Sequence, residues 1–440
     1  HQDEIRLLRD SFAEMQTSLA EYVRELTATT AQKASMESEL KKGYSISNYS
    51  FSIVFVILSL LGISCFVLYR LQGQSPDNFV LKQLLGGMLG LFAMVVVSLI
   101  DYHFICKLFV PLYLFSILLL LICKYVTYSQ FRFVYGWSHW GTKRWIKIGG
   151  SGVAGSGFEF MPSEITKIVM VIVLAKLFTL LDTKLKTVLG MLICIAVVGL
   201  PIYFIYDQPD LSTSIVLAAS FLCLLFIAGL SYKVFACGIL IGVPLLYGLF
   251  WYAQQDYQVL LNEYQQKRIL SLLHPTEYKD LMYQQNNAAA AISSGGMFGK
   301  FVVGDTGKRL TNSVPVVESD FIFSAIGEEL GFFGCAIVIA IYVLFVFLSF
   351  RIARRAKDRL GYLLASGVAM TISLQAIVNI GVVLSLLPNT GIPLPFVSSG
   401  LSSLVTNIAT VGLLLNIGLQ NKDVEIDDRY EFEEGLLDKT

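Results

Sequence analysis

Long apolar runs separated by polar connections occupy the chain from Tyr49 onward. A helix needs about 20 consecutive apolar residues to cross the hydrocarbon core of a lipid bilayer. Runs of this kind occupy residues 50–69, 80–100, 104–123, 163–181, 186–206, 211–229, 233–252, 321–350, 361–387 and 400–419. The pattern therefore predicts an all-α polytopic membrane protein with about ten transmembrane helices.

The polar connections predict how these helices are oriented in the membrane. Two connections are long, 124–162 and 253–320, and the second is a large extracytoplasmic loop before the eighth predicted helix. Lys and Arg concentrate in cytoplasmic loops, and the most basic short loop is "RIARRAKDR" at 351–359. With ten spans, this loop predicts that both termini are cytoplasmic and that both long loops lie on the outer side.

The two ends of the chain differ from the membrane domain, which we predict at residues 44–420. Residues 1–43 carry apolar residues three and four positions apart, a pattern typical of an amphipathic or coiled-coil helix. This seam consists of Ile5, Leu8, Phe12, Met15, Leu19, Tyr22 and Leu26. The segment is either a cytosolic helix or a fused addition, because it contains no residues that suggest chemistry. Residues 421–440 form an acidic tail, which we predict to be cytoplasmic.

The composition agrees with a membrane protein and narrows the classes of function. Of the 440 residues, 55% are hydrophobic and 15% are charged, whereas soluble proteins average about 45–50% and about 25%. The formal net charge is zero, so nothing indicates a nucleic-acid partner. The seven cysteines lie in apolar runs without metal-binding or redox spacing, and we expect no cleavable signal peptide.

Ionisable residues within predicted membrane spans are costly and therefore indicate function. Glu164 and Lys167 lie three residues apart at the start of the fourth span, so they share a helix face and can pair. They form either a structural ion pair or a charged face that lines an outward-open cavity. Asp210 begins the sixth span, where it either caps the helix or faces the same cavity. Glu328 and Glu329 lie inside the eighth span.

Two outer segments complete the predicted cavity. The segment "WSHWGTKRWIKIGG" is basic although it lies on the outer side, and it contains Arg144 and Lys147. It is either an interfacial anchor or a cradle for the head group of an anionic membrane lipid. The segment "LLPNTGIPLPFVSSGLSSL", with Ser398 and Ser399, is rich in Pro, Gly and Ser near membrane depth. Non-helical backbone at that depth is tolerated only when it is buried in protein or lines a water-filled cavity.

Five motifs resemble one family when they are taken together and in order. They are "MPSEITKI", "DQPDLSTS", "SSGGMFGK", "SDFIFSAIGEELGFFG" and "NTGIPLPFVSSGLSSL". Over residues 45–420 the chain is similar to the SEDS family, the RodA/FtsW/SpoVE peptidoglycan polymerases. The resemblance implies a glycosyltransferase that polymerises lipid II into glycan strands at the outer face of the bacterial cytoplasmic membrane. It also implies a class B penicillin-binding protein as the partner, beside lipid II, the growing strand and membrane lipid.

The resemblance also assigns roles to residues of these motifs. Asp320 matches the family's essential aspartate before "FIF", and we predict that it is the general base, with a helix cap as the alternative. Glu164 and Lys167 match the family's charged pair. Lys300 of "SSGGMFGK" is a further candidate for substrate binding, and Glu318 is the next candidate for the base. A divalent cation such as Mg²⁺ or Mn²⁺ is an open possibility for neutralising the leaving group.

The chain departs from the family pattern at several positions. Met161 replaces the usual Gln before "PSE", Phe301 stands where the loop usually continues with Gly, and Val316 replaces a Glu, although Glu318 lies nearby. The family's "SYGG" reads "SSGL" at 398–401. These differences concern loop details and lipid contacts and leave the family assignment unchanged. The wording of "NTGIPLPFVSSG" fits either RodA or FtsW, so a RodA, FtsW or SpoVE role stays open. A flippase for lipid-linked precursors and a non-catalytic scaffold for a penicillin-binding protein are the alternative functions. A transporter usually shows inverted repeats, which the sequence lacks.

Overall fold

The computed structural model describes residues 49–72, 78–127, 131, 133–139, 142–149, 158–230, 263–274, 277–305, 307–389 and 391–420, with scattered positions between 240 and 258. The predicted coiled-coil segment and the predicted acidic tail lie outside the described residues. All the observations below concern the unit that begins at Ser50.

Most of the described chain is helical, as the apolar pattern predicts. Within the described residues, six helices are long and apolar enough to cross a membrane: α2 (Phe51–Gln72), α3 (Phe79–Leu99), α7 (Val188–Asp207), α13 (Ile322–Arg354), α14 (Arg359–Val383) and α15 (Leu401–Leu419). Two apolar helices are shorter, α5 (Phe109–Tyr125) and α8 (Leu211–Ile227). Helix α6 (Pro162–Leu181) is apolar apart from its charged residues. Nine of the ten predicted spans therefore coincide with helix, and the seventh, 233–252, lies mostly outside the described residues.

The third predicted span is divided into two helices. A short helix, α4 (Tyr102–Lys107), precedes α5, and Leu108 separates the two. Pro111 lies in the first turn of α5. Because proline has no backbone N–H, it cannot donate to the carbonyl of Lys107 and so cannot continue α4.

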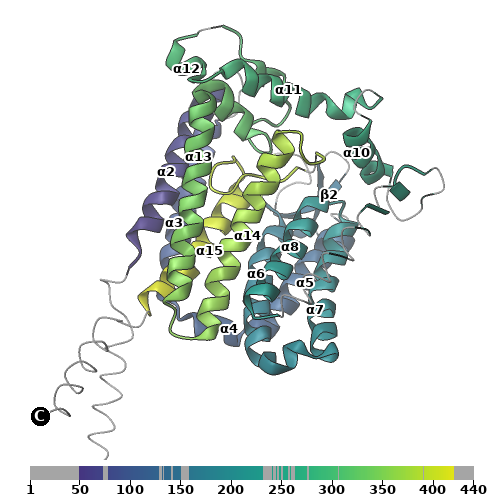
Figure 1. Cartoon of the computed structure of the whole chain (residues 1–440), viewed down its shortest axis with the longest axis vertical. Coiled ribbons are helices and arrows are strands. Elements are labelled where there is room, and N and C mark those ends of the chain that lie inside the picture. Colours follow the sequence, from purple (N-terminus) through teal and green to yellow (C-terminus); the bar gives the residue numbers. More distant parts are fainter. Residues whose placement is uncertain are drawn as a thin grey trace, which may run out of the picture. The chain divides into compact units, whose positions relative to one another are not determined.

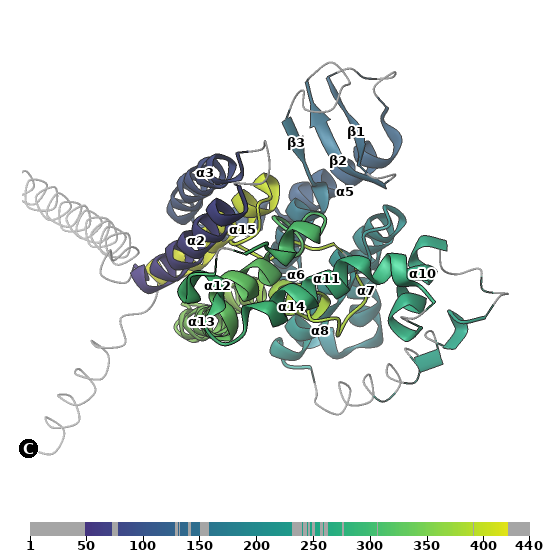
Figure 2. The same cartoon turned by 90° about the horizontal axis from the view of Figure 1, so that it is seen from above.

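Helices α14 and α15 are the most enclosed of the long helices described, and α14 packs against α6, α8, α13 and α15. Helix α3 packs closely against α15 (Figures 1 and 2) because small residues line the contact. A Cβ atom added at Gly412 would lie 2.6 Å from the backbone oxygen of Met94, so glycine is needed for this close approach. These contacts create the buried surroundings in which polar side chains must find partners.

The two long connections gather at the same end of the helices (Figure 1). The first forms a three-stranded antiparallel sheet against α5, with strands β1 (Val134–His139), β2 (Thr142–Ile148) and β3 (Phe158–Phe160) in that order. The second contains α10 (Glu263–Leu273), α11 (Lys279–Gly295), α12 (Gly299–Val303) and the 3-10 helix η3 (Leu310–Ser313). At the other end, the 3-10 helix η2 (Asp182–Lys186) joins α6 to α7. The prediction of a helical protein is confirmed. The three-stranded sheet was not predicted from the sequence.

Helix α13 is broken at Gly331, within a stretch that is apolar apart from Glu328 and Glu329 and that the sequence predicts as one span. The backbone there has φ 68° and ψ −164°, which glycine adopts readily and other residues rarely do. The turn at 296–299 inserts into the break, since Phe332 N donates to Gly296 O at 2.9 Å and Phe333 N donates to Met297 O at 3.2 Å. The motifs "SSGGMFGK" and "GEELGFFG" therefore form the two sides of one packing contact.

Candidate active site at the start of α13

Asp320 lies in the turn immediately before α13, at the end of the molecule that carries both long connections. Its side chain is half-buried, and its Oδ1 atom accepts a hydrogen bond from Ser319 Oγ at 2.8 Å. The residue that caps α13 is Phe321, without a side-chain hydrogen bond, so the alternative that Asp320 serves as the helix cap is wrong. The carboxylate therefore lies near the first turn of α13 without accepting a capping hydrogen bond from its backbone N–H groups.

The surroundings of Asp320 change its acidity. Burial raises the pKa of this carboxyl group, because desolvation disfavours its charged form. The hydrogen bond from Ser319 and the positive charges of Arg144 and Arg268 act in the opposite direction, while the charge of Glu318 adds to the increase. The pKa remains above that of an ordinary aspartate, which makes the carboxylate a better proton acceptor near neutral pH.

The segment 391–400 is packed against the turn that carries Asp320. Ser398 Oγ donates to Ser319 O at 2.5 Å, and Ser399 N donates to Glu318 O at 2.8 Å. Gly391 has φ 62°, and a Cβ atom there would lie 2.9 Å from Asp320 Oδ2. The structure therefore brings the predicted residues Glu318, Ser398 and Ser399 together with Asp320.

Glu164 and Lys167 form the ion pair that their spacing predicts. Lys167 Nζ lies 2.9 Å from Glu164 Oε1, and both side chains are almost completely buried. Lys167 also donates to Gln375 Oε1 on α14 at 2.5 Å. Among the described residues, Glu164 Oε2 has no hydrogen-bond partner. The pair is thus connected to α14 and retains one unused acceptor.

The junction between α7 and α8 contains Asp210, and Arg144 on β2 reaches the same junction. Asp210 caps α8 by accepting from Thr213 N at 3.2 Å, as the capping interpretation predicts, and it also accepts from Ser163 Oγ at 3.3 Å. Arg144 on β2 donates to Gln208 O at 3.2 Å. Asp210 is therefore joined to the residue that precedes Glu164, and Arg144 attaches the sheet to this junction.

Lys147 occupies the sheet itself. Its side chain is fully buried, its Nζ atom lies 3.1 Å from Glu159 Oε1, and it lies 4.1 Å from the centre of the Trp137 ring. Such a desolvated ammonium group over an aromatic face is stabilised by the ring's quadrupole. These contacts hold Lys147 between neighbouring strands.

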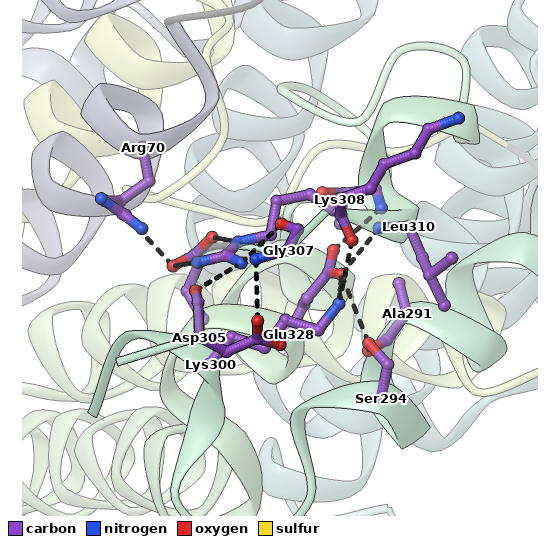
Figure 3. A network of polar contacts seen from close by, with 12 residues as sticks. Arg70, Ala291, Ser294, Lys300, Asp305, Gly307, Lys308, Leu310 and Glu328 are labelled. Atoms are coloured by element: carbon purple, nitrogen blue, oxygen red, sulfur yellow. Dashed lines mark hydrogen bonds and ion pairs between the residues drawn. The ribbon is translucent and has the colours of Figure 1, made fainter. Parts of the chain in front are cut away.

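Lys300 belongs to a second polar cluster, which we call the glutamate cluster and which is built on Glu328 and Glu329 (Figure 3). The fully buried carboxylate of Glu328 accepts from Lys300 Nζ at 2.5 Å, Leu310 N at 2.7 Å, Thr311 N at 2.8 Å and Ser294 Oγ at 3.3 Å. This cluster attaches the connection between α11 and α13 to the first turns of α13.

Glu329 completes the glutamate cluster with two arginines. Arg309 Nε lies 2.5 Å from Glu329 Oε1, and Arg70 Nε, at the end of α2, lies 3.1 Å from Glu329 Oε2. Both glutamates stand inside an apolar run, which is the signal that could have assigned them a role from the sequence. The amides Gln375 and Asn379 on α14 are further polar residues near Asp320 that the sequence analysis missed.

These features define a class of protein: a polytopic membrane protein with buried ionisable residues near the end of its helices that carries both long connections. Within the described residues, no group of three or more His, Cys, Asp or Glu side chains is placed to hold a metal ion. The divalent cation therefore stays a prediction.

The chain belongs to the FtsW/RodA/SpoVE family of cell cycle proteins, whose family model matches residues 47–423. It is 32% identical over 341 residues to a probable peptidoglycan glycosyltransferase FtsW of Geobacter sp. (strain M18), covering 77% of this chain and 86% of that protein. It is 30% identical over 374 residues to the peptidoglycan glycosyltransferase MrdB of Escherichia coli (strain K12), covering 84% and 94%.

Solved structures show the same fold. One chain, from work on the structural coordination of polymerization and crosslinking by a peptidoglycan synthase complex, aligns with a TM-score of 0.68 and 24% identity, covering 84% of this chain and 97% of that chain. The rod shape determining protein RodA of Thermus thermophilus aligns with a TM-score of 0.59 and 22% identity, covering 85% and 98%. The predictions of the family and of a polytopic membrane fold are thus confirmed.

Proposed function

We propose that this protein is a peptidoglycan glycosyltransferase that polymerises lipid II into glycan strands at the outer face of the bacterial cytoplasmic membrane. The activity in the names of the FtsW and MrdB relatives supports this proposal. The observation that carries it is Asp320, a half-buried carboxylate with a raised pKa at the end of α13 where the long loops gather.

Asp320 is the general base in this proposal. A sugar hydroxyl attacks an anomeric carbon, a carbon–oxygen bond forms, and the bond to the lipid pyrophosphate breaks. The attacking hydroxyl transfers its proton to Asp320, and such a transfer typically contributes about 10²–10⁴-fold to the rate. Direct displacement requires no covalent sugar–enzyme intermediate, so a single base is sufficient. Glu318 is the next candidate for the base, and a divalent cation could assist the departing pyrophosphate.

The residues joined to the Asp320 turn serve substrate binding in this proposal. Lys167 of the ion pair donates to Gln375, which holds Pro393 in the segment packed against the turn. Asp210 accepts from Ser163, the residue before Glu164. Arg144 contributes a positive charge close enough to affect Asp320. Ser398 and Ser399 hold the backbone of the turn. Lys147 and Lys300 act indirectly, since the contacts described above place them in the sheet and in the glutamate cluster.

The proposed orientation follows the basic residues. Arg354 ends α13, and Arg355 and Lys357 follow it in the connection to α14, at the end of the helices opposite the long loops. Basic loops remain in the cytoplasm. Both termini are then cytoplasmic, 253–320 is extracytoplasmic, and the membrane domain covers 44–420 between the N-terminal segment and the acidic tail.

The proposed partner is a class B penicillin-binding protein. One of the structurally similar chains comes from a peptidoglycan synthase complex that coordinates polymerization and crosslinking. In this chain, α12 and the region around the break in α13 expose apolar side chains at the same end as Asp320: Met297, Phe298, Val302, Val303, Phe332 and Phe333. An exposed apolar surface of this kind suits a membrane-embedded or juxtamembrane partner. Elongation, division and sporulation remain the candidate processes.

Polymerisation of labelled lipid II by the purified protein tests the proposed function. The protein is incubated in detergent with and without a class B penicillin-binding protein, and the products are separated by gel electrophoresis. A ladder of glycan strands is the expected result. Absence of strands in both reactions, together with movement of labelled lipid II across vesicles that contain the protein, would identify a transporter instead. Absence of both activities would favour the scaffold.

A further inference from the structure

Two amide side chains on α14 connect Asp320 to the segment 391–400. Asn379 Nδ2 donates to Asp320 O at 2.8 Å and to Ile392 O at 2.7 Å, so both of its amide hydrogens are used. One turn earlier, Gln375 Nε2 donates to Pro393 O at 2.9 Å. Two consecutive carbonyls of the segment are therefore held by two residues on the same face of one helix.

These amides also reach the buried ion pair. Gln375 Oε1 accepts from Lys167 Nζ at 2.5 Å, and Lys167 pairs with Glu164 at 2.9 Å. Gln375 and Asn379 are 0% and 1% exposed, so neither amide can exchange its partners for bulk water. Hydrogen bonds thus link the ion pair of α6 through Gln375 to Pro393, and Asn379, one turn further along α14, joins the adjacent Ile392 to Asp320.

We propose that Asn379 is a positioning residue that fixes the Asp320 carboxylate in its half-buried place by holding its backbone carbonyl against segment 391–400. Gln375 holds the same segment through Pro393 and joins it to Lys167. This inference rests on the proposed function of Asp320. Asn379 acts through Asp320 and has no part in the proton transfer itself.

The physical consequence concerns both rate and acidity. A base must lie within hydrogen-bond distance of its proton, and a misplacement of about 1 Å can cost about 10²-fold in rate. A released turn would also let water reach the carboxylate. Of the described charged groups, Arg144 on β2, Arg268 on α10 and Glu318 in the same turn act on Asp320. Since burial is what raises its pKa, greater hydration would lower it.

The substitution Asn379→Leu removes both donors without adding a charge and keeps a similar size. Asn416 on α15 offers a matched control, because it is also fully buried and donates to a backbone carbonyl, Ser98 O, at 2.8 Å. Asn416 makes these contacts near α4, since its Oδ1 atom accepts from Tyr102 N at 2.9 Å. Asn416→Leu therefore reports the general cost of losing a buried amide.

The test measures the rate of lipid II polymerisation against pH for both variants. We expect Asn379→Leu to lower kcat by about 10–100-fold with little change in KM, and to move the acid limb of the pH–rate profile to lower pH. Asn416→Leu should keep the native midpoint of the acid limb. A native kcat for Asn379→Leu, or a loss no greater than that of Asn416→Leu with an unmoved acid limb, would overturn the proposal.

A second measurement separates this inference from the proposed function. Hydrogen–deuterium exchange needs no activity, and we expect Asn379→Leu to speed exchange in peptides covering 314–322 and 391–400 together. Asn416→Leu should leave both peptides as in the native protein. If native protein does not polymerise lipid II but this joint loosening occurs, the proposed function fails and the positioning contact stands. If neither peptide changes, the inference fails whatever the activity.

Discussion

Replacing Glu328 by glutamine tests whether the glutamate cluster attaches residues 305–313 to α13. The carboxylate is 0% exposed and accepts three strong hydrogen bonds, from Lys300 Nζ, Leu310 N and Thr311 N, at 2.5–2.8 Å. Glutamine has the same length but a single acceptor oxygen, so its NH₂ group must face one of these donors. The ammonium group of Lys300, only 10% exposed, loses its counter-charge.

The magnitude follows from these two losses. Removing one partner of a buried ion pair costs about 3–5 kcal/mol, because the remaining charge stays desolvated. An unsatisfied buried N–H costs about 1–3 kcal/mol. Lys300 can regain some hydration through its exposed fraction, so the two costs do not add in full. We therefore expect Glu328→Gln to weaken the attachment of residues 305–313 to α13 by about 3–5 kcal/mol.

Hydrogen–deuterium exchange of peptides covering 305–313, together with thermal unfolding in detergent, measures this loss. Asp182→Asn is the control, because Asp182 pairs with Arg359 at an exposed position, with side chains 57% and 40% exposed, and should change stability by no more than about 1 kcal/mol. Adding Lys300→Met to Glu328→Gln removes the stranded charge and should restore part of the stability. Native exchange in the single variant, or a double variant no more stable than the single one, would refute this reasoning.

Three further predictions concern the backbone break, the cap of α8 and the pH dependence. Gly331→Ala places a Cβ atom against Gly299 N at a residue with a positive φ, so little folded protein should appear in size-exclusion profiles. A native profile would contradict the insertion of the turn 296–299 into the break. Asp210→Asn should keep the cap on Thr213 N and native thermal stability, whereas Asp210→Ala should lose about 1 kcal/mol; equal losses would show that the charge matters instead. Because the base must be deprotonated and burial raises the pKa of Asp320, polymerisation should slow as the pH falls through a pKa above that of an ordinary aspartate. An acid limb at the pKa of an ordinary aspartate would contradict this.

Features that depend on local periodicity were predictable from the sequence. Apolar run length predicted the position of nine helices of the described chain, six of which are long and apolar enough to cross a membrane, because each span must satisfy its backbone within itself. The spacing of Glu164 and Lys167 predicted their pairing because residues three apart share a helix face. The position of Asp210 before an apolar run predicted its cap on α8.

Features that depend on distant contacts were not predictable in this way. The predicted span of α13 continues through Gly331, so its apolar pattern does not indicate a break. The break is stabilised by a turn about 32–35 residues earlier in the chain. The partners of Glu328 likewise come from 17 to 34 residues away. Lys300 was predicted from its motif to bind substrate, and nothing in the sequence indicated that it pairs with Glu328, 28 residues away. The sheet was missed because "RWIKI" alternates in a way that suits either a strand or an interfacial segment.

The measurement that tests the central claim most directly is lipid II polymerisation by the Asp320→Asn variant, purified together with a class B penicillin-binding protein. Asparagine keeps the size of the side chain and can still accept a hydrogen bond from Ser319, but it cannot take a proton from the attacking hydroxyl. The account predicts native expression, thermal stability and partner binding, with a rate lower by about 10²–10⁴-fold. Polymerisation near the native rate would contradict it and would transfer the role of base to another carboxylate, with Glu318 the first to examine.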